Sequence, residues 1–268
     1  MNKNINIMKF PMKYKLSDLD IFNNRTNEIL WFLGFFAADG CVSRYNTISI
    51  SQSGKEGRKR IEFAKEILNV NNKILNTKPP KGQLVHTLQI TNKKLQNDLN
   101  KFGITPNKSL TLDYPNSLKE NEHAAFLSGY IDGDGCVGIY KNAEKTPYLV
   151  ISMVGTEKFI NKVNTIVPVQ GNIVHIKRVK NCFDLRWNGR KAKTMGEWLW
   201  DSQPCGFKQV AFRKFDFTKT QYFKNDPIRK EGIILIKQGI PCMEISKKLN
   251  IAFQTVYKWK ANIDYYDR

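Results

Sequence analysis

Apolar residues gather in two dense runs, and each run is followed by sequence that alternates between apolar and polar positions. Over Asn24–Ala38 the apolar side chains cover nearly every face of a helix, which predicts a helix that is buried on most sides. A similar run precedes Asp134, with Asn121 as a candidate N-cap residue. Gly34 and Gly129 remove side-chain bulk, so each helix can approach another backbone closely.

The sequence after each run predicts strands and amphipathic helices in the same order. Asn46–Gln52 alternates with a period of two, as a half-buried strand does, and Tyr148–Met153 is its counterpart. The other predicted elements are the helices Arg58–Leu68, Lys93–Phe102, Glu157–Ile166 and Ala192–Asp201 and the strands Leu84–Ile90 and Cys182–Trp187. Each half therefore reads as helix, two strands, helix, two strands, helix, and the expected fold class is α+β.

The two apolar runs are copies of one phrase. Residues 32–42 and 126–137 both end in Asp-Gly-Cys-Val, and the acidic residues Asp39 and Asp134 are 95 positions apart. A repeat of this length predicts two similar halves that meet about a pseudo-two-fold axis. Asp39 and Asp134 are the natural pair at that axis.

Residues 228–268 read as a separate unit after a polar linker at 218–227. Helices are expected over Ile228–Lys237, Pro241–Lys248 and Ala252–Lys260. The core of a helix-turn-helix is expected from Glu244, Ile245, Leu249, Ile251, Val256 and Trp259, and the exposed reading face from Gln254, Thr255, Tyr257, Lys258 and Lys260. Residues 244–259 resemble helix-turn-helix modules of resolvases and phage regulators; the alternative is a generic small helical bundle.

The composition predicts the kind of binding partner and the cellular compartment. The 268 residues contain 43 Lys and Arg against 24 Asp and Glu, a net charge of +19, which points to nucleic acid unless it reflects a generally basic composition. Five cysteines without a C-x-x-C pair favour a reducing compartment over disulfides or a zinc ribbon. No secretory signal or membrane span is expected, so the predicted location is the cytoplasm of a bacterial or phage-infected cell or an organelle matrix.

The repeated phrase resembles the LAGLIDADG motif, and the arrangement over residues 25–217 is similar to a monomeric, two-repeat LAGLIDADG homing endonuclease. Phe102–Leu112 resembles the basic segment that precedes the second motif in that family. The resemblance implies two αββαββα repeats, at 25–120 and 121–217, after a basic arm at 1–24. It also implies a saddle of strands over duplex DNA, with the motif helices at the interface between the repeats.

Physical chemistry supports carrying the family's metal site over to Asp39 and Asp134. Each acid follows the C-terminus of a buried helix, where exposed carbonyls and the negative end of the dipole favour a cation. Two carboxylates brought together repel each other unless a divalent ion lies between them, and hard oxygen ligands favour Mg²⁺, with Mn²⁺ as a substitute. Such an ion clamps the oxygens of a phosphodiester during hydrolysis.

The resemblance also suggests helpers around the acids. Lys108 is the first candidate for stabilising the phosphate and Lys208 the second, although both could be phosphate contacts without a catalytic role. Gln52 could orient a water molecule, a role that its expected counterpart Met153 cannot fill.

Several other residues near the motifs are expected to be structural. Asp132 stands where the first motif has Ala37, and we expect it to act as a cap at the helix junction. Cys41 and Cys136 are expected to pack as small buried residues. His86, His123 and His175 match no metal or nuclease spacing and are expected to be structural or to contact DNA.

Three functions fit these observations. The first is a site-specific, metal-dependent endonuclease that cuts double-stranded DNA as a monomer, with the C-terminal unit lengthening the recognised site. The second is a regulator that binds DNA without cutting it. The third is an RNA-splicing maturase built on the same basic surface.

Overall fold

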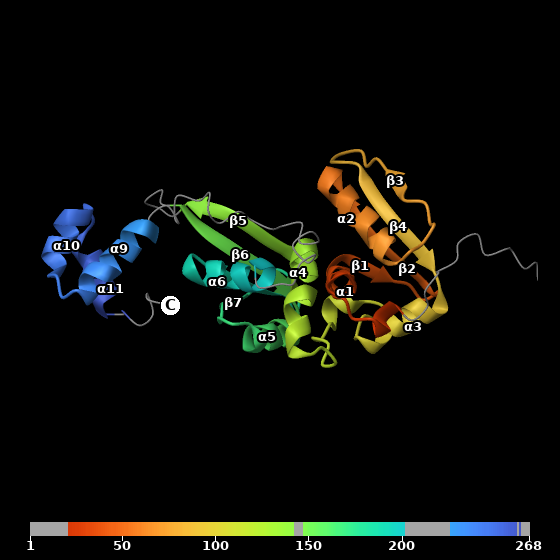
Figure 1. Ribbon diagram of the computed structural model, residues 1–268. Coiled ribbons are helices and arrows are strands. Elements are labelled where there is room, and N and C mark those ends of the chain that lie inside the picture. Colours follow the sequence, from red (N-terminus) through yellow and green to blue (C-terminus); the bar gives the residue numbers. More distant parts are fainter. Residues whose placement is uncertain (1–20, 142–146, 202–225, 262, 264–268) are drawn as a thin grey trace, which may run out of the picture. The chain divides into compact units, whose positions relative to one another are not determined.

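The computed structural model describes residues 21–141, 147–201, 226–261 and 263, drawn in colour in Figure 1. The chain divides into two compact units: Met1–Gly138 with Val150–Phe215, and Ile139–Leu149 with Asp216–Arg268. Within the described residues, no helix has the length and apolar character needed to cross a membrane.

The first half begins with a short 3-10 turn and continues as the predicted helix–strand–strand pattern. Its elements are η1 (Ile21–Asn23), α1 (Asn27–Asp39), β1 (Gly40–Val42), β2 (Thr47–Ser53), α2 (Gly54–Ile67), β3 (Leu75–Thr77), β4 (Val85–Thr91) and α3 (Lys93–Lys101). The strands form an antiparallel sheet in the order β1-β2-β4-β3.

The second half repeats this order. After η2 (Lys108–Leu110) and η3 (Glu120–Glu122), its elements are α4 (His123–Asp134), β5 (Gly135–Lys141), β6 (Pro147–Gly155), α5 (Glu157–Ile166), β7 (Asn172–His175), β8 (Phe183–Asn188), α6 (Arg190–Gly196) and the π-helical turn η4 (Glu197–Asp201). The strand order is β5-β6-β8-β7. The predicted α+β class and the αββαββα order of each half are confirmed.

In the first sheet, alternation along the middle strands gives the sheet one buried face. Ile48 and Ile50 of β2 and Leu88 and Ile90 of β4 are buried, whereas the residues between them are partly or fully exposed. The predicted arm at 1–24 contributes to this core through Phe22, whose ring packs against Phe32 and Phe102.

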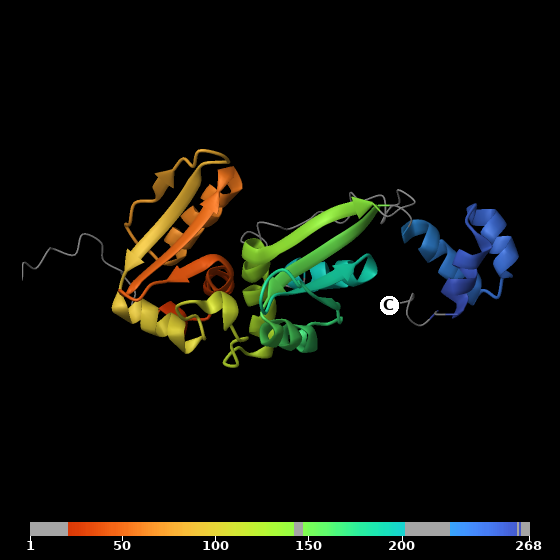
Figure 2. The ribbon, with the colours of Figure 1, turned by 180° about the vertical axis from the view of Figure 1, so that it is seen from behind.

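The two motif helices α1 and α4 pack directly against each other, as Figures 1 and 2 show from opposite sides. A Cβ atom built on Gly34 would overlap the carbonyl group of Phe126, and one built on Gly129 would overlap the carbonyl group of Trp31. The two contacts are related by the repeat. Glycine is therefore required at both positions for the helices to reach this separation.

One polar pair breaks the symmetry of this contact. Asp132 is 1% exposed, and its Oδ2 accepts a hydrogen bond of 2.8 Å from the indole Nε1 of Trp31. In the repeat, Ala37 of the first half corresponds to Asp132 of the second, and Trp31 of the first half corresponds to Phe126 of the second. We expected Asp132 to be structural, as a cap at the helix junction; its carboxylate instead bonds across the helix interface.

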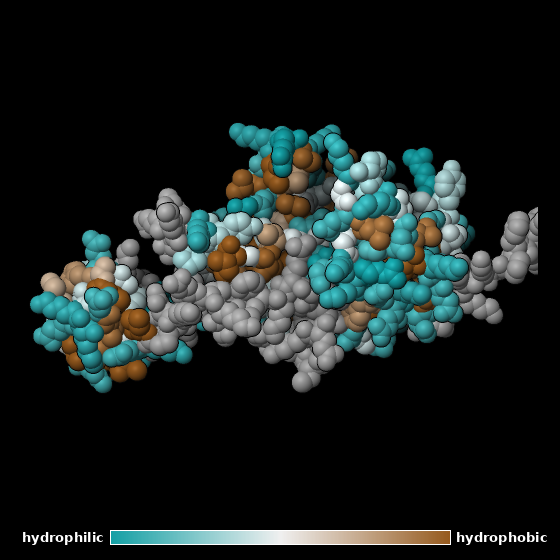
Figure 3. All heavy atoms as spheres, turned by 90° about the horizontal axis from the view of Figure 1, so that it is seen from above, coloured by the Kyte–Doolittle hydropathy of each residue, from teal (hydrophilic) through white to brown (hydrophobic). Residues whose placement is uncertain are grey.

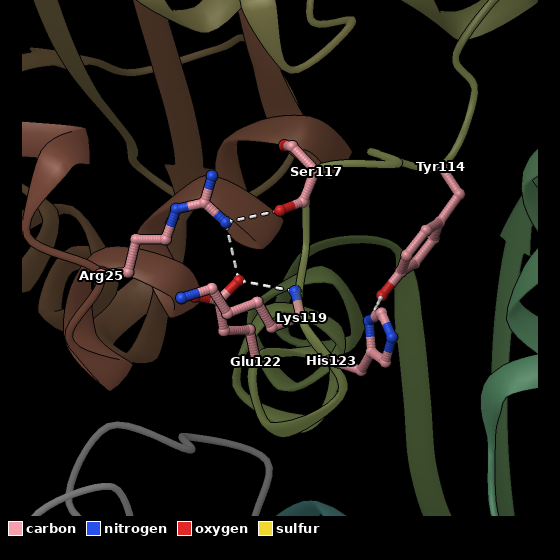
Figure 4. A network of polar contacts seen from close by, with 6 residues as sticks. All are labelled: Arg25, Tyr114, Ser117, Lys119, Glu122 and His123. Carbon is pink, nitrogen blue, oxygen red and sulfur yellow. Dashed lines mark hydrogen bonds and ion pairs between the residues drawn. The ribbon is translucent and has the colours of Figure 1, made fainter.

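The starts of α1 and α4 are tied to the segment that joins the halves (Figure 4). Arg25 donates to the carbonyl oxygen of Ser117 and to Glu122 Oε2, both at 2.7 Å, and Glu122 also accepts from the backbone N–H of Lys119. The expected N-cap at Asn121 was wrong, because α4 begins at His123 and Asn121 lies inside η3.

The second unit contains three short helices, α9 (Asp226–Lys237), α10 (Cys242–Leu249) and α11 (Phe253–Ala261). Its buried core is Ile233, Leu235, Ile236, Ile245, Val256 and Trp259. Glu244, which we expected in the core, is exposed, whereas Ile233, Leu235 and Ile236 of α9 belong to the core.

The surface of this unit mixes hydrophilic and hydrophobic residues in the view of Figure 3. The large apolar side chains it exposes include Ile234, Met243 and Phe253.

We expect Gly34→Ala to destabilise the protein strongly, because the added methyl group meets the Phe126 backbone. Overpacking of this kind costs about 1–3 kcal/mol, and each kcal/mol lowers the melting temperature of a protein of this size by about 2–4 °C. Thermal unfolding followed by circular dichroism measures the shift. Glu66→Ala, at an exposed position of α2, is the control. A Gly34→Ala protein that melts like the control would contradict the close backbone contact.

Candidate active site

The two motif acids are the last residues of the two packed helices. Asp39 ends α1 and Asp134 ends α4, and the following glycines, Gly40 and Gly135, cap the helices through their backbone N–H groups. A Cβ atom built on Gly133 would lie 2.8 Å from Oδ2 of Asp39. The carboxylate of Asp39 therefore lies against the last turn of α4, beside Asp134.

The surroundings of Asp39 disfavour the ionised form of its carboxyl group. Burial, followed by the charge of Asp134, raises the pKa of Asp39 to about 6, against the opposing effects of Lys108, Gln52 and Arg60. At neutral pH the two carboxylates repel each other in a partly buried setting. A cation placed between them would relieve this repulsion.

Lys108 brings a positive charge to both acids. Its side chain is buried, with 6% of the residue exposed, and Nζ donates a hydrogen bond of 2.5 Å to the carbonyl oxygen of Ala38. Burial lowers the pKa of Lys108, while the charges of Asp134 and Asp39 act in the opposite direction. Asn107, in the left-handed conformation with φ of 62°, turns the chain just before this lysine.

Gln52 and Arg60 extend the site on the side of Asp39. Nε2 of Gln52 donates to Oδ2 of Asp39 at 2.5 Å, and Nη1 of Arg60 donates to Oε1 of Gln52 at 3.0 Å. The sequence placed Gln52 in the site but missed Arg60, because several basic residues precede and follow it on α2 and no motif distinguishes one of them.

The expected counterpart of Gln52 was wrong. The N-cap residue of α2, Ser53, is the last residue of β2, and the N-cap residue of α5, Thr156, directly follows the last residue of β6. Aligning these caps places Gly155, and not Met153, at the position of Gln52. Met153 is instead a fully buried core residue of β6.

The donor set fits a hard divalent cation. Two carboxylates supply oxygen ligands and negative charge, as Mg²⁺ and Ca²⁺ prefer. Among the described residues no three His, Cys, Asp or Glu side chains are grouped so as to hold a metal ion. Asp39 and Asp134 are the two carboxylates at the helix ends that could hold such an ion.

The exposure of the two motif cysteines differs from what the sequence predicted, and each histidine has a partner in the structure. Cys41 is exposed and Cys136 half-buried, so the expectation that both are buried was wrong; Cys41 alternates to the outer face of β1 between two buried neighbours. His86 is bonded to Asn76, His123 to Tyr114, and His175 stacks on Phe183.

The other predicted residues lie elsewhere. Lys208 falls outside the described residues, as does the side chain of Lys258. On α11, in the second unit, Gln254, Tyr257 and Lys260 are exposed and Thr255 is half-buried.

The outer face of the first sheet carries polar, uncharged side chains. Thr47 and Thr91 pair through their hydroxyl groups at 2.9 Å, and Ser51 and Thr87 pair at 2.8 Å, while Gln89 is exposed between them. Hydroxyl and amide groups are able to hydrogen-bond base edges, and a two-stranded ribbon fits the major groove of DNA.

Comparison with solved structures gives distant similarities. The LAGLIDADG homing endonuclease I-LtrWI bound to its target DNA is 13% identical over 88% of this chain and 97% of its own, with a TM-score of 0.43. The homing endonuclease I-DmoI, in complex with DNA and Ca, is 16% identical over 70% of this chain and 98% of its own, with a TM-score of 0.45.

Comparison of the sequence gives one further match. Among curated proteins, none matches this chain. A family model described as the LAGLIDADG-like domain matches residues 27–103, the segment from α1 to the end of α3 that carries Asp39, Gln52 and Arg60. Residues 27–103 are therefore similar to a LAGLIDADG-like domain.

Proposed function

We propose that the protein is a site-specific, metal-dependent endonuclease that cuts double-stranded DNA and acts as a monomer. The observation that carries this proposal is the meeting of Asp39, Asp134 and the buried Lys108 at the ends of two helices whose backbones touch. The similarity of residues 27–103 to the LAGLIDADG-like domain supports the same reaction class.

Each residue of the site has a role in this proposal. Asp39 and Asp134 would hold Mg²⁺, with Mn²⁺ as a substitute, and the ion supplies charge that stabilises the oxygens of a phosphodiester during hydrolysis. Lys108 places a cation beside the scissile phosphate, where negative charge develops in the transition state. Gln52 orients the Asp39 carboxylate through its amide N–H.

The substrate follows from charge and surface chemistry. The net charge of +19 attracts a polyanion, and the polar outer face of the first sheet offers hydrogen-bonding groups to bases. Phosphate contacts would position the duplex, and base contacts would select the site.

We further propose that α9, α10 and α11 of the second unit form a helix-turn-helix that reads DNA beside the cut site. Only residues 250–252 separate α10 from α11, and Asn250 ends α10 in the left-handed conformation that a tight turn requires. The face that contacts DNA would carry Gln254, Tyr257 and Lys260, with Thr255 at its edge. We assign Lys258 to the same face from its position in the sequence.

We expect the purified protein to cut a duplex target only when Mg²⁺ or Mn²⁺ is present. Asp39→Asn and Asp134→Asn should each abolish cutting, because both carboxylates hold the ion. Target affinity should stay within about tenfold of the wild type, a difference of ~1.4 kcal/mol.

A plasmid library digested with Mg²⁺ and with EDTA, together with gel-shift binding in Ca²⁺, tests this expectation. Binding without cutting by the wild-type protein would favour a DNA-binding regulator, and preference for a structured intron RNA would favour a maturase. Full cutting by either variant would refute the shared ion.

Metal-free protein should be stabilised by Asp39→Asn at pH 7.5. Because the pKa of Asp39 is higher in the folded protein than in the unfolded chain, ionisation of Asp39 lowers the free energy of unfolding. This loss of stability begins as the pH rises above the usual pKa of an Asp carboxyl and is complete once the pH is above about 6. Added Mg²⁺ should raise the melting temperature of the wild type and leave the variant nearly unchanged, since ligand binding stabilises the folded state by mass action. Differential scanning calorimetry with EDTA and with Mg²⁺ measures both effects. Equal responses to Mg²⁺ would contradict the assignment of Asp39 as a ligand.

Removing residues 228–268 should weaken target binding and shorten the protected footprint on one side only. The truncated protein should still cut the same phosphates at high concentration, because Asp39, Asp134 and Lys108 remain. Trp259→Ala should mimic the deletion, since losing a buried Trp costs about 3–5 kcal/mol, whereas Lys260→Ala should spare the fold and reduce affinity alone. Footprinting of all three proteins is the measurement. An unchanged footprint after deletion would refute DNA reading by this unit.

A further inference from the structure

The last helix of the second unit, α11, turns one side to its core and the opposite side to solvent. Val256 and Trp259 are buried in the core, whereas Phe253 is 42% exposed and Tyr257 is 60% exposed. Residues four positions apart share a helix face, so these two aromatic side chains lie on one side of α11. Gln254 is also exposed and lies next to Phe253 in the sequence. We call Phe253, Gln254 and Tyr257 the outer face of α11.

Contacts on both sides of α11 hold this helix in one orientation within its unit. A Cβ atom built on Gly232 of α9 would overlap the indole ring of Trp259, so this ring packs directly on the α9 backbone. In the turn before α11, the N–H of Ile251 donates to the carbonyl oxygen of Ser246 at 3.1 Å. The hydroxyl group of Ser246 donates in return to the carbonyl oxygen of Ile251 at 2.6 Å. The direction of the outer face is therefore fixed by the core and by the turn.

The outer face combines an aromatic pair with a basic background. The ring centroids of Phe253 and Tyr257 are 6.2 Å apart, so the two rings form one exposed apolar surface. Residues 228–261 contain seven Lys and Arg against two Glu, and the sequence of α11 contains two Lys and no acidic residue. This charge favours DNA as the occupant of the face. In the major groove, the C5 methyl group of thymine is the apolar group that an aromatic ring can contact, and the amide of Gln pairs with N6 and N7 of adenine.

We propose that the outer face of α11 selects neighbouring T·A base pairs, and that Phe253 is a specificity-determining residue. This inference rests on the proposed reading of DNA by the second unit. The rings of Phe253 and Tyr257 contact thymine methyl groups, while Gln254 bonds to an adenine. The N-terminal residues of a recognition helix are those that contact base edges, and Phe253 and Gln254 are the first two residues of α11.

Replacement of single thymines by uracil tests the apolar contact, because uracil pairs as thymine does but lacks the C5 methyl group. The full-length protein first selects duplexes from a pool of random sequence in the absence of Mg²⁺. The flank whose protection requires residues 228–268 should be enriched in T and A. In synthetic copies of the selected duplex, uracil at a contacted thymine should weaken binding about fourfold, which corresponds to ~0.8 kcal/mol for one buried methyl group. Gel-shift titration measures the affinities.

Variants of the outer face assign the effect to its residues. Phe253→Ala should weaken binding of the thymine duplex and remove the response to uracil at one position, and Tyr257→Ala should do so at another. Tyr257→Phe keeps the ring and should keep the response. Gln254→Ala should lower the preference for adenine over guanine at the adjoining position by about tenfold. Ile234→Ala is the matched control, because it removes an exposed apolar side chain from α9, and it should respond to uracil as the wild type does.

The outcomes separate this inference from the proposed function of the second unit. A footprint that is the same with and without residues 228–268 would overturn both. A flank that requires these residues but binds equally well with thymine and with uracil would overturn the thymine contact alone, as would a full uracil response in Phe253→Ala. Partial unfolding of a variant would weaken binding of both duplexes equally, so it would not imitate the expected change in their ratio.

Discussion

The structure of the two halves depends on a contact between two helix backbones. Where Gly34 meets Phe126 and Gly129 meets Trp31, no side chain separates α1 from α4. This closeness brings the two helix ends together. Asp39 therefore lies against the last turn of α4, where the charge of Asp134 helps to raise its pKa. Lys108 enters from the segment between the halves and bonds to the last turn of α1. Wider spacing of the helices would separate the carboxylates and remove the reason for a shared cation.

Much of this arrangement could be predicted from the sequence, because local rules determine it. Apolar residues on every face predict buried helices, a period of two predicts β2 and β4, and the repeat pairs Asp39 with Asp134. The predicted bounds of α5 agree with the structure, since Thr156 caps its start as local chemistry favours. Lys108 was also found, but only because a sequence motif marks it.

Features that depend on pairing across the fold were missed. The counterpart of Gln52 depends on which residues precede the caps of α2 and α5, and alternation alone placed it two positions too early. The neighbourhood of His86 and Asn76 follows from strand register, which the sequence leaves open for β3 because all three of its residues are exposed. The exposure of Cys41 and the start of α4 at His123 likewise depend on short elements, a three-residue strand and a 3-10 turn, that leave little pattern in the sequence.

The Trp31–Asp132 bond makes the two halves complementary and not interchangeable. If two copies of the first half met through α1, each would present an indole N–H to Ala37, and two copies of the second half would bury one Asp132 against the other's Phe126. Burying such groups without their partner costs free energy. The pair therefore favours contact between a first half and a second half over contact between two copies of the same half. A chimera that joins either half to one from another protein would need to carry both members, or replace both, to assemble in the same register.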